Sequence, residues 1–191
     1  MQATFATLFV RTGEQTLIQK AVLVLLGSAL LAVSAKVQVP FLPVPMTMQT
    51  LVVLLMGAHA GTRLAGLTVL AYLLEGAVGL PVFSTGAGLA FMAGPTGGYL
   101  VGFLVSALLV SFAVERGLTR TLPAAFAVFV VGDLAIFCLG VAWLSKLIGF
   151  EKALMVGVVP FLPAEALKIA LATASLPLVR WFTARDTDQT A

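Results

Sequence analysis

No Asp, Glu, Lys or Arg occurs between Gly76 and Val114, and this charge-free stretch limits what the chain can fold into. A soluble domain carries about 25% charged residues, whereas this chain of 191 residues carries 10% and is 60% hydrophobic. Apolar stretches of this kind are typical of membrane-spanning helices, because lipid offers the backbone no hydrogen-bond partners. The sequence therefore predicts an all-α integral membrane protein with a single polytopic domain.

Six apolar segments, separated by short polar or irregular stretches, predict six transmembrane helices. They lie at about residues 21–35, 47–58, 64–79, 98–114, 123–143 and 161–182. Residues 19–182 then form one membrane domain, between an N-terminal segment (1–18) and a C-terminal tail (183–191). Val33-Ser34-Ala35 would also suit a signal-peptidase site, but the long polar leader and the later spans favour an uncleaved first helix.

Six spans place both ends of the chain on the same side of the membrane. The basic residues divide unevenly: Arg11, Lys20, Arg63, Arg116, Arg120, Arg180 and Arg185 lie on the side of the termini, and Lys36, Lys146 and Lys152 lie opposite. Cytoplasmic loops are enriched in Lys and Arg. We therefore expect a multi-pass protein of the cell (inner or plasma) membrane with both termini in the cytoplasm. The net charge of +3 reflects this topology and does not indicate nucleic-acid binding.

Two stretches of the chain are unsuited to a continuous helix. Residues 39–46 contain three prolines, which break helices, and residues 79–99 are rich in glycine and broken by proline. Irregular backbone at membrane depth is tolerated only where protein buries it or where it lines a cavity. We expect residues 79–99 to form a lid or pocket wall, with apolar faces from Phe83, Phe91 and Tyr99. A compact surface loop is the alternative.

Glu165 and Lys168 stand in the last apolar segment, where Pro163 suits the first turn of a helix. Residues three apart share one helix face, and each charge within a membrane costs about 2.5–3.5 kcal/mol on insertion scales. Such a pair is either a structural ion pair between helices or part of a ligand site near one membrane face. The predicted topology brings this helix start and both irregular stretches to the outer face, which favours an outward-facing solute pocket.

Four other polar or reactive residues need an interpretation. We expect His59 at a turn near the membrane surface, Glu75 at a solvated interface, and Cys138 as a buried, inert thiol. Asp133 falls in the middle of the fifth apolar segment, where an acid is as readily functional as structural. Its role is left open at this point.

Five motifs, in order along the chain, resemble the BioY family, the biotin-specific S components of energy-coupling factor (ECF) vitamin transporters. They are Pro43-Val-Pro-Met-Thr-Met-Gln-Thr-Leu51, Gly79-Leu-Pro-Val-Phe83, Gly94-Pro-Thr-Gly-Gly-Tyr99, Gly140-Val-Ala-Trp-Leu144 and Pro160-Phe-Leu-Pro-Ala-Glu-Ala-Leu-Lys168. The resemblance covers about residues 20–180. It implies a six-helix S-component fold that holds biotin near the outer face, under the first, third and fifth loops.

The resemblance also implies a set of substrate-binding residues: Glu165, Lys168, Gln49, Phe83, Ser84, Thr85, Phe91 and Tyr99. Glu165 and Lys168 match the family's acidic-x-x-Lys motif, and a carboxylate and an ammonium complement the N–H and C=O groups of the biotin ureido ring. In the alternative arrangement, Lys168 meets the carboxylate of biotin. Ser84 and Thr85 stand where relatives often carry Asn.

The partners that the resemblance implies are a transmembrane coupling subunit and two ATP-hydrolysing subunits, and a homo-oligomer is left open. A ridge of small residues, Gly27, Ser28 and Ala32, is either a partner-docking surface or ordinary packing inside the molecule. The chain has no Gly-x-x-x-x-Gly-Lys-Ser/Thr motif, so ATP-driven work would come from the partners. We expect no metal and no cofactor, with biotin as the transported ligand.

Three other functions compete with this interpretation: an S component for another small vitamin, an intramembrane enzyme, and a passive channel or structural subunit. An intramembrane protease would need a Ser/His pair, a His-Glu-x-x-His motif or two facing acids. Only Asp133 with Glu75 or Glu165 offers the last of these, so we expect a transporter subunit and not an enzyme. A channel would show no saturable ligand.

Overall fold

The computed structural model describes residues 16–188, with side chains up to residue 177. Most of the predicted N-terminal segment, the last residues of the tail and the side chains of Arg11, Arg180 and Arg185 lie outside this description. The division of the chain into segment, domain and tail therefore stays a prediction.

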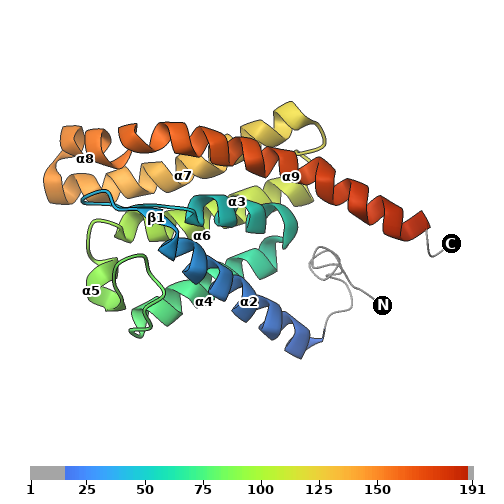
Figure 1. Ribbon diagram of the computed structural model, residues 1–191, viewed down its shortest axis with the longest axis horizontal. Coiled ribbons are helices and arrows are strands. Elements are labelled where there is room, and N and C mark those ends of the chain that lie inside the picture. The colour runs from blue at the N-terminus through green and yellow to red at the C-terminus, as the bar shows by residue number, and fades with distance from the viewer. Residues whose placement is uncertain (1–15, 189–191) are drawn as a thin grey trace.

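The described chain is almost entirely helical, which confirms the predicted fold class (Figure 1). Its elements in order are α2 (Leu17–Lys36), β1 (Gln38–Val39), β2 (Met46–Thr47), α3 (Gln49–His59), α4 (Thr62–Ala77), α5 (Gly88–Met92), α6 (Gly97–Glu115), α7 (Leu122–Ile148), α8 (Phe150–Gly157), the 3-10 turn η1 (Val159–Phe161) and α9 (Leu162–Asp188).

Four stretches are long and apolar enough to cross a membrane, and two helices fall short of that length. The four are α2, α6, α7 and residues 150–177, which comprise α8, η1 and most of α9. The other two are α3, with 11 residues, and α4, with 16. The predicted number of six transmembrane helices is therefore not confirmed, because length and composition support four complete spans among the described residues.

The two ends of the molecule are built differently (Figure 1). At one end, on the left of the view, lie β1, α5 and α8 with the irregular connections between them. The start of α2 and the end of α9 point toward the other end. There, α3 is joined to α4 through Ala60 and Gly61, and α6 to α7 through residues 116–121. We call these the loop end and the turn end.

The proline-rich stretch forms a short β-ribbon, which the sequence did not predict. β1 pairs antiparallel with β2, with Gln38 opposite Thr47 and Val39 opposite Met46. Met48 is the N-cap residue of α3, and its side chain makes no capping hydrogen bond. The Thr47 hydroxyl nevertheless accepts a hydrogen bond from the Gln49 N–H, at 3.3 Å.

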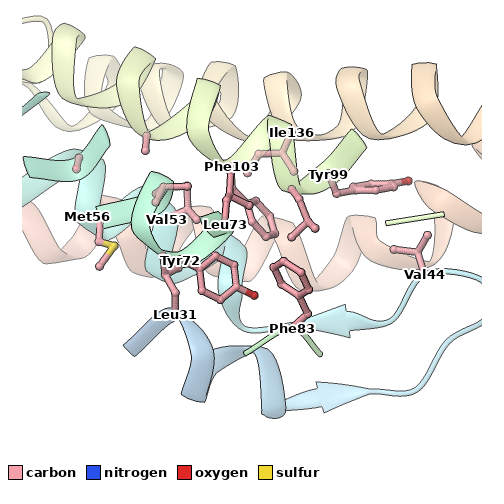
Figure 2. Packing of buried hydrophobic residues seen from close by; sticks show 14 of the residues in the cluster. Leu31, Val44, Val53, Met56, Tyr72, Leu73, Phe83, Tyr99, Phe103 and Ile136 are labelled. Atoms are coloured by element: carbon pink, nitrogen blue, oxygen red, sulfur yellow. The ribbon is translucent and has the colours of Figure 1, made fainter. Parts of the chain in front are cut away.

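Side chains from α2, α3, α4, α6 and α7 meet in one apolar core (Figure 2), which extends from the loop end to Ala60 and Leu64 beside the α3–α4 turn. Figure 2 shows Leu31, Val53, Tyr72, Phe103 and Ile136 turned toward this common interior. Backbones approach closely here: a Cβ atom on Gly102 of α6 would lie 2.7 Å from the Ile136 Cα of α7. Glycine at this position lets the two helices pack almost in backbone contact.

A second, smaller core joins α3, α6, α7 and α9. Its buried members are Leu54, Ala58, Val110, Ala125, Phe129, Ile169, Ala172 and Leu176. Many large apolar side chains outside both cores are exposed, for example Leu25, Phe126 and Leu167. Exposed apolar surface of this extent is expected where a protein faces lipid.

Candidate functional site

A pocket opens at the loop end, where the stretches that the sequence singled out converge. We call residues 78–96, which connect α4 to α6 and include α5, the third loop. The β-ribbon region contributes Val44, Pro45 and Thr47, the third loop contributes Phe83, Ser84 and Phe91, and η1 and α9 contribute Phe161 and Glu165. The remaining walls come from α3, α4, α6 and α7. Segments far apart in sequence thus meet around one space, as the predicted topology requires.

Aromatic rings form much of the pocket wall. The Phe83 ring lies edge-on to Tyr72, with centroids 5.5 Å apart, and stacks on Phe91 at 5.1 Å. On the other side Phe137 contacts Tyr99 and Phe161, with centroids 5.9 and 5.8 Å away. Such pairs favour edge-on or offset arrangements. The wall suits a ligand that has apolar surface.

The Phe83 ring packs directly against the backbone of α4 because that helix has a glycine, Gly76, at the point of contact. A Cβ atom on Gly76 would lie 2.0 Å from the Phe83 Cζ atom, which no real contact allows. The ring is 1% exposed. Gly76 therefore makes room for the ring that anchors the third loop over the pocket.

Glu165 and Lys168 form a buried ion pair beside the pocket, with Lys168 Nζ 2.7 Å from Glu165 Oε1. The Lys168 ammonium also donates to the Thr47 carbonyl oxygen at 2.7 Å and to Thr50 Oγ1 at 2.9 Å. An ammonium has three N–H donors, so protein acceptors occupy all of them. Glu165 lines the pocket, whereas Lys168 does not. Lys168 thus ties α9 to the start of α3 and orients the Glu165 carboxylate.

Gln49 joins a neutral hydrogen-bond chain along the pocket. Its Nε2 donates to the Tyr72 hydroxyl oxygen at 2.7 Å, and the Tyr72 hydroxyl donates to the Val82 carbonyl oxygen at 3.3 Å. The Gln49 side chain is 3% exposed. The chain connects α3, α4 and the third loop and so fixes the shape of the wall.

The third loop is also held from the end of α2. Lys36 Nζ donates to the Phe83 carbonyl oxygen at 2.5 Å, and Gln38 Nε2 donates to the Ser84 carbonyl oxygen at 3.4 Å. Ser84 lines the pocket, but Thr85 is exposed and does not. We call the Lys36 and Gln38 contacts the loop latch.

Six of the eight predicted binding residues line the pocket: Glu165, Gln49, Phe83, Ser84, Phe91 and Tyr99. Lys168 lies directly behind it and Thr85 outside it. The sequence did not single out the further lining residues Thr50, Tyr72, Thr96, Leu100, Phe103, Ile136, Phe137 and Phe161. Six of them are aromatic or apolar residues of a kind that also occurs on lipid-facing surfaces. Thr50, Thr96 and Phe161 lie within three of the five family motifs, but the sequence analysis did not predict them as binding residues.

The predicted docking ridge packs largely inside the molecule, which is the alternative that the sequence left open. Ser28 is fully buried and donates a hydrogen bond from its hydroxyl to the Glu75 carboxylate. A Cβ atom on Gly27 would lie 2.6 Å from the Thr68 side chain. Ala32 is half-buried. Glu75, which we expected at a solvated interface, is partly exposed and also has this hydrogen-bond partner within the membrane domain.

Two other expectations can be compared with the structure. Cys138 is exposed, so the prediction of a buried thiol was wrong. The buried face of α7 carries Phe129, Gly132, Asp133 and Ile136, and Cys138 lies on the opposite, lipid-facing side. His59 is the last residue of α3, as expected of a residue beside a turn, and its Nε2 atom lies 3.0 Å from Ser175 Oγ of α9.

Comparisons with known proteins agree on one family. The family model described as "BioY family" matches residues 4–185. The "Probable biotin transporter BioY" of Pyrococcus horikoshii is 38% identical over 151 residues, which cover 78% of this chain and 89% of that protein. The "Biotin transporter BioY2" of Lactococcus lactis is 36% identical over 171 residues, which cover 87% and 93%.

A similar fold occurs among solved structures. The crystal structure of "the S-component for biotin from an ECF-type ABC transporter" superposes with a TM-score of 0.73 and 23% sequence identity. The superposition covers 90% of this chain and 95% of the other. At this level of identity the likeness supports the architecture alone.

Proposed function

The chain belongs to the BioY family, and from this premise we propose that it is the biotin-binding membrane subunit of an ECF transporter. The observation that carries the proposal is the pocket at the loop end, where aromatic walls enclose a buried carboxylate. Biotin has matching parts: an apolar bicyclic body and a ureido ring with two N–H donors and one C=O acceptor.

We assign the direct polar contact to Glu165. Its Oε1 atom accepts from Lys168, while Oε2 is buried and has no donor in the described part of the chain. A buried carboxylate oxygen without a donor is unfavourable, and an N–H group of the ureido ring would supply one. Lys168 has no free donor left, so it acts by positioning Glu165. This favours the ureido ring over the biotin carboxylate as the group nearest to the pair.

We place the carboxylate of biotin toward the third loop. Ser84 and Thr96 line the pocket and offer hydroxyl donors, and no Lys or Arg is among the residues that line it. Hydroxyls and backbone N–H groups bind a carboxylate less strongly than a cation does. This end of the ligand would therefore contribute less to the affinity than the ureido end.

Energy for uptake would come from partner subunits: a transmembrane coupling subunit and two ATP-hydrolysing subunits. The sequence has no phosphate-binding Gly-x-x-x-x-Gly-Lys-Ser/Thr motif of its own. This chain is a transporter subunit and not an enzyme. We place both termini in the cytoplasm and the pocket at the outer face, on the distribution of basic residues.

The deciding experiment is equilibrium binding of labelled biotin to the purified, detergent-solubilised protein, with unlabelled biotin, thiamine and riboflavin as competitors. Saturable binding that only biotin displaces supports the proposal. Displacement by another vitamin would reassign the substrate, and a folded protein without saturable binding would favour a channel or structural role.

Two variants test the assigned contact in the same assay. Glu165→Gln replaces the acceptor that faces the pocket, and Glu151→Gln makes the same change at an exposed position of α8. We expect a loss of affinity of roughly 10- to 100-fold in the first, because a hydrogen bond to a charged group is removed. The second should bind like the wild type. Equal affinities in both would contradict the role of Glu165.

A further inference from the structure

Three ionisable side chains are buried together between α7 and α9. Asp133 is 7% exposed, Glu165 3% and Lys168 4%. The cluster holds two acids and one base, so it carries a net charge of −1 if all three groups are ionised. An uncompensated charge in such a place is strongly unfavourable.

The hydrogen bonds of the cluster leave a buried oxygen of each acid without a donor. All three Lys168 donors go to Glu165 Oε1, the Thr47 carbonyl and Thr50 Oγ1, and none goes to Asp133. Asp133 Oδ1 and Glu165 Oε2 are the two buried oxygens left over.

On α7, Asp133 lies one turn from Phe137, whose ring contacts Phe161 of η1, directly before α9, with centroids 5.8 Å apart. Asp133 also lies one turn from Phe129, which shares the second core with Ile169 of α9. Glu165 lies one turn from both Phe161 and Ile169, so the two carboxyl groups face each other across the two helices. Two carboxylates cannot bond to each other, but a carboxylic acid can donate to a carboxylate.

We infer that Asp133 and Glu165 share one proton, and that Asp133 is the positioning residue that holds the ligand-facing Glu165 oxygen in place. A single shared proton resolves both the missing hydrogen bonds and the unbalanced charge. It gives the two leftover oxygens a hydrogen bond, and it makes the cluster neutral, with Glu165 ionised against Lys168 and Asp133 protonated. A carboxylate oxygen can accept two hydrogen bonds, so Glu165 Oε2 still has a lone pair for a ligand N–H.

The elements packed against α7 offer no competing charge at this point. α3 carries no charged residue, and its only histidine, His59, lies at the far end against Ser175. The charged residues of α6 and α8 are Glu115, Glu151 and Lys152, and all three are exposed. The hydroxyl of Tyr99 donates to the Gly157 carbonyl oxygen. The charges that act on Asp133 are therefore those of Glu165 and Lys168.

The shared proton predicts how ligand affinity changes with pH. Loss of the proton in alkaline solution leaves two facing carboxylates against one ammonium, so they repel each other and Glu165 moves from its place. We therefore expect affinity for biotin to fall as the pH rises through the loss of this proton. This consequence rests on the proposed function, whereas the shared proton itself does not.

Infrared spectroscopy of the protein without ligand tests the proton directly. We expect a C=O stretching band of a buried carboxylic acid in the wild type, shifted by exchange into D₂O. Both Asp133→Asn and Glu165→Gln should abolish it, because the single remaining acid then pairs with Lys168 as a carboxylate. Glu151→Gln should keep it. A wild type without the band, or a band that survives both cluster substitutions, would overturn the inference.

Biotin binding as a function of pH tests the consequence. Asp133→Asn keeps a neutral donor to Glu165, so we expect affinity near that of the wild type at neutral pH without the alkaline loss. Asp133→Val removes the donor and should weaken binding roughly 10- to 100-fold at every pH. An Asn variant that retains the alkaline loss, or that binds as poorly as the Val variant, would contradict the positioning role.

The two tests separate the two proposals. A wild type that shows the infrared band but no saturable biotin binding would defeat the proposed function and leave the shared proton standing. Saturable biotin binding without the infrared band would support the proposed function and overturn the shared proton.

Discussion

The loop end and the turn end of this molecule are stabilised in different ways. At the turn end the second core is entirely apolar, and short connections join neighbouring helices. Polar contacts between remote positions occur at both ends, and at the turn end His59 lies 3.0 Å from Ser175 of α9. At the loop end such contacts involve buried groups around the pocket: Lys168 reaches Thr47 across 121 residues, and Tyr99 reaches Gly157 across 58.

This difference predicts that the two ends contribute to different properties, the turn end to the stability of the fold and the loop end to ligand affinity. Apolar packing is non-directional and tolerates many side chains of similar size, whereas buried polar contacts need each partner in place. Substitutions at the turn end should therefore lower stability and leave the affinity of the folded protein alone. Substitutions at the loop end should change the affinity first.

Lys168→Met is the strongest test of the expected difference between the two ends. The change removes the only base of the cluster, so the two acids lose their counter-charge and the Thr47 carbonyl oxygen loses its donor. Removing one partner of a buried ion pair costs about 3–5 kcal/mol, so we expect biotin affinity to fall by at least roughly 100-fold. Equilibrium binding measures it, and Lys152→Met, at an exposed position of α8, is the control. Near-normal affinity would contradict the assignment of the biotin site to the loop end.

A smaller effect, on stability, is expected from Phe129→Leu in the second core. Phe129 is fully buried, and truncating its ring should cost about 1–3 kcal/mol. Thermal unfolding in detergent should shift down by roughly 2–12 °C, while biotin affinity at a temperature where the protein is folded stays unchanged.

Phe126→Leu makes the same chemical change three residues away on α7, where the side chain is exposed. We expect no shift in its unfolding temperature. A large loss of affinity in Phe129→Leu would mean that the two ends are not separable.

The smallest expected effect comes from the loop latch. Lys36→Met removes the Lys36 donor from the Phe83 and Ser84 carbonyl oxygens and leaves the Gln38 contact to Ser84, so it should loosen the third loop over the pocket. A hydrogen bond at this exposed position contributes about 0.5–1.5 kcal/mol. We expect a two- to ten-fold faster dissociation of biotin, measured by chasing labelled with unlabelled ligand. Lys20→Met, on the same helix at the turn end, is the control, and equal rates in the two would contradict the latch.

Much of this arrangement could be predicted from the sequence, because membrane helices have a recognisable pattern of long apolar segments with few charges. Helix positions followed from runs of apolar residues, and the convergence at the loop end followed from counting spans. Glu165 and Lys168 stood out because charges are rare in such runs. Phe83 and Phe91 stood out because they lie in a stretch that cannot be a helix.

The rotation of each helix about its axis could not be predicted. An apolar helix in lipid lacks the polar face that marks the outside of a soluble helix. Cys138 was therefore placed on the wrong side of α7, and Tyr72 and Phe137 were not recognised as pocket residues. The partner of Asp133 stayed unknown for the same reason, since the contact depends on how α7 and α9 face each other.

The shortness of α3 determines how deep a solute lies once it is bound. Its 11 residues extend only about 16 Å at 1.5 Å per residue, roughly half of a hydrocarbon layer about 30 Å thick. Gln49 and Thr50, at its first turn, form the floor of the pocket. A molecule resting on that floor has already travelled about half the width of the membrane. The second core, which includes Leu54 and Ala58 farther along α3, fills the remaining distance to the turn end.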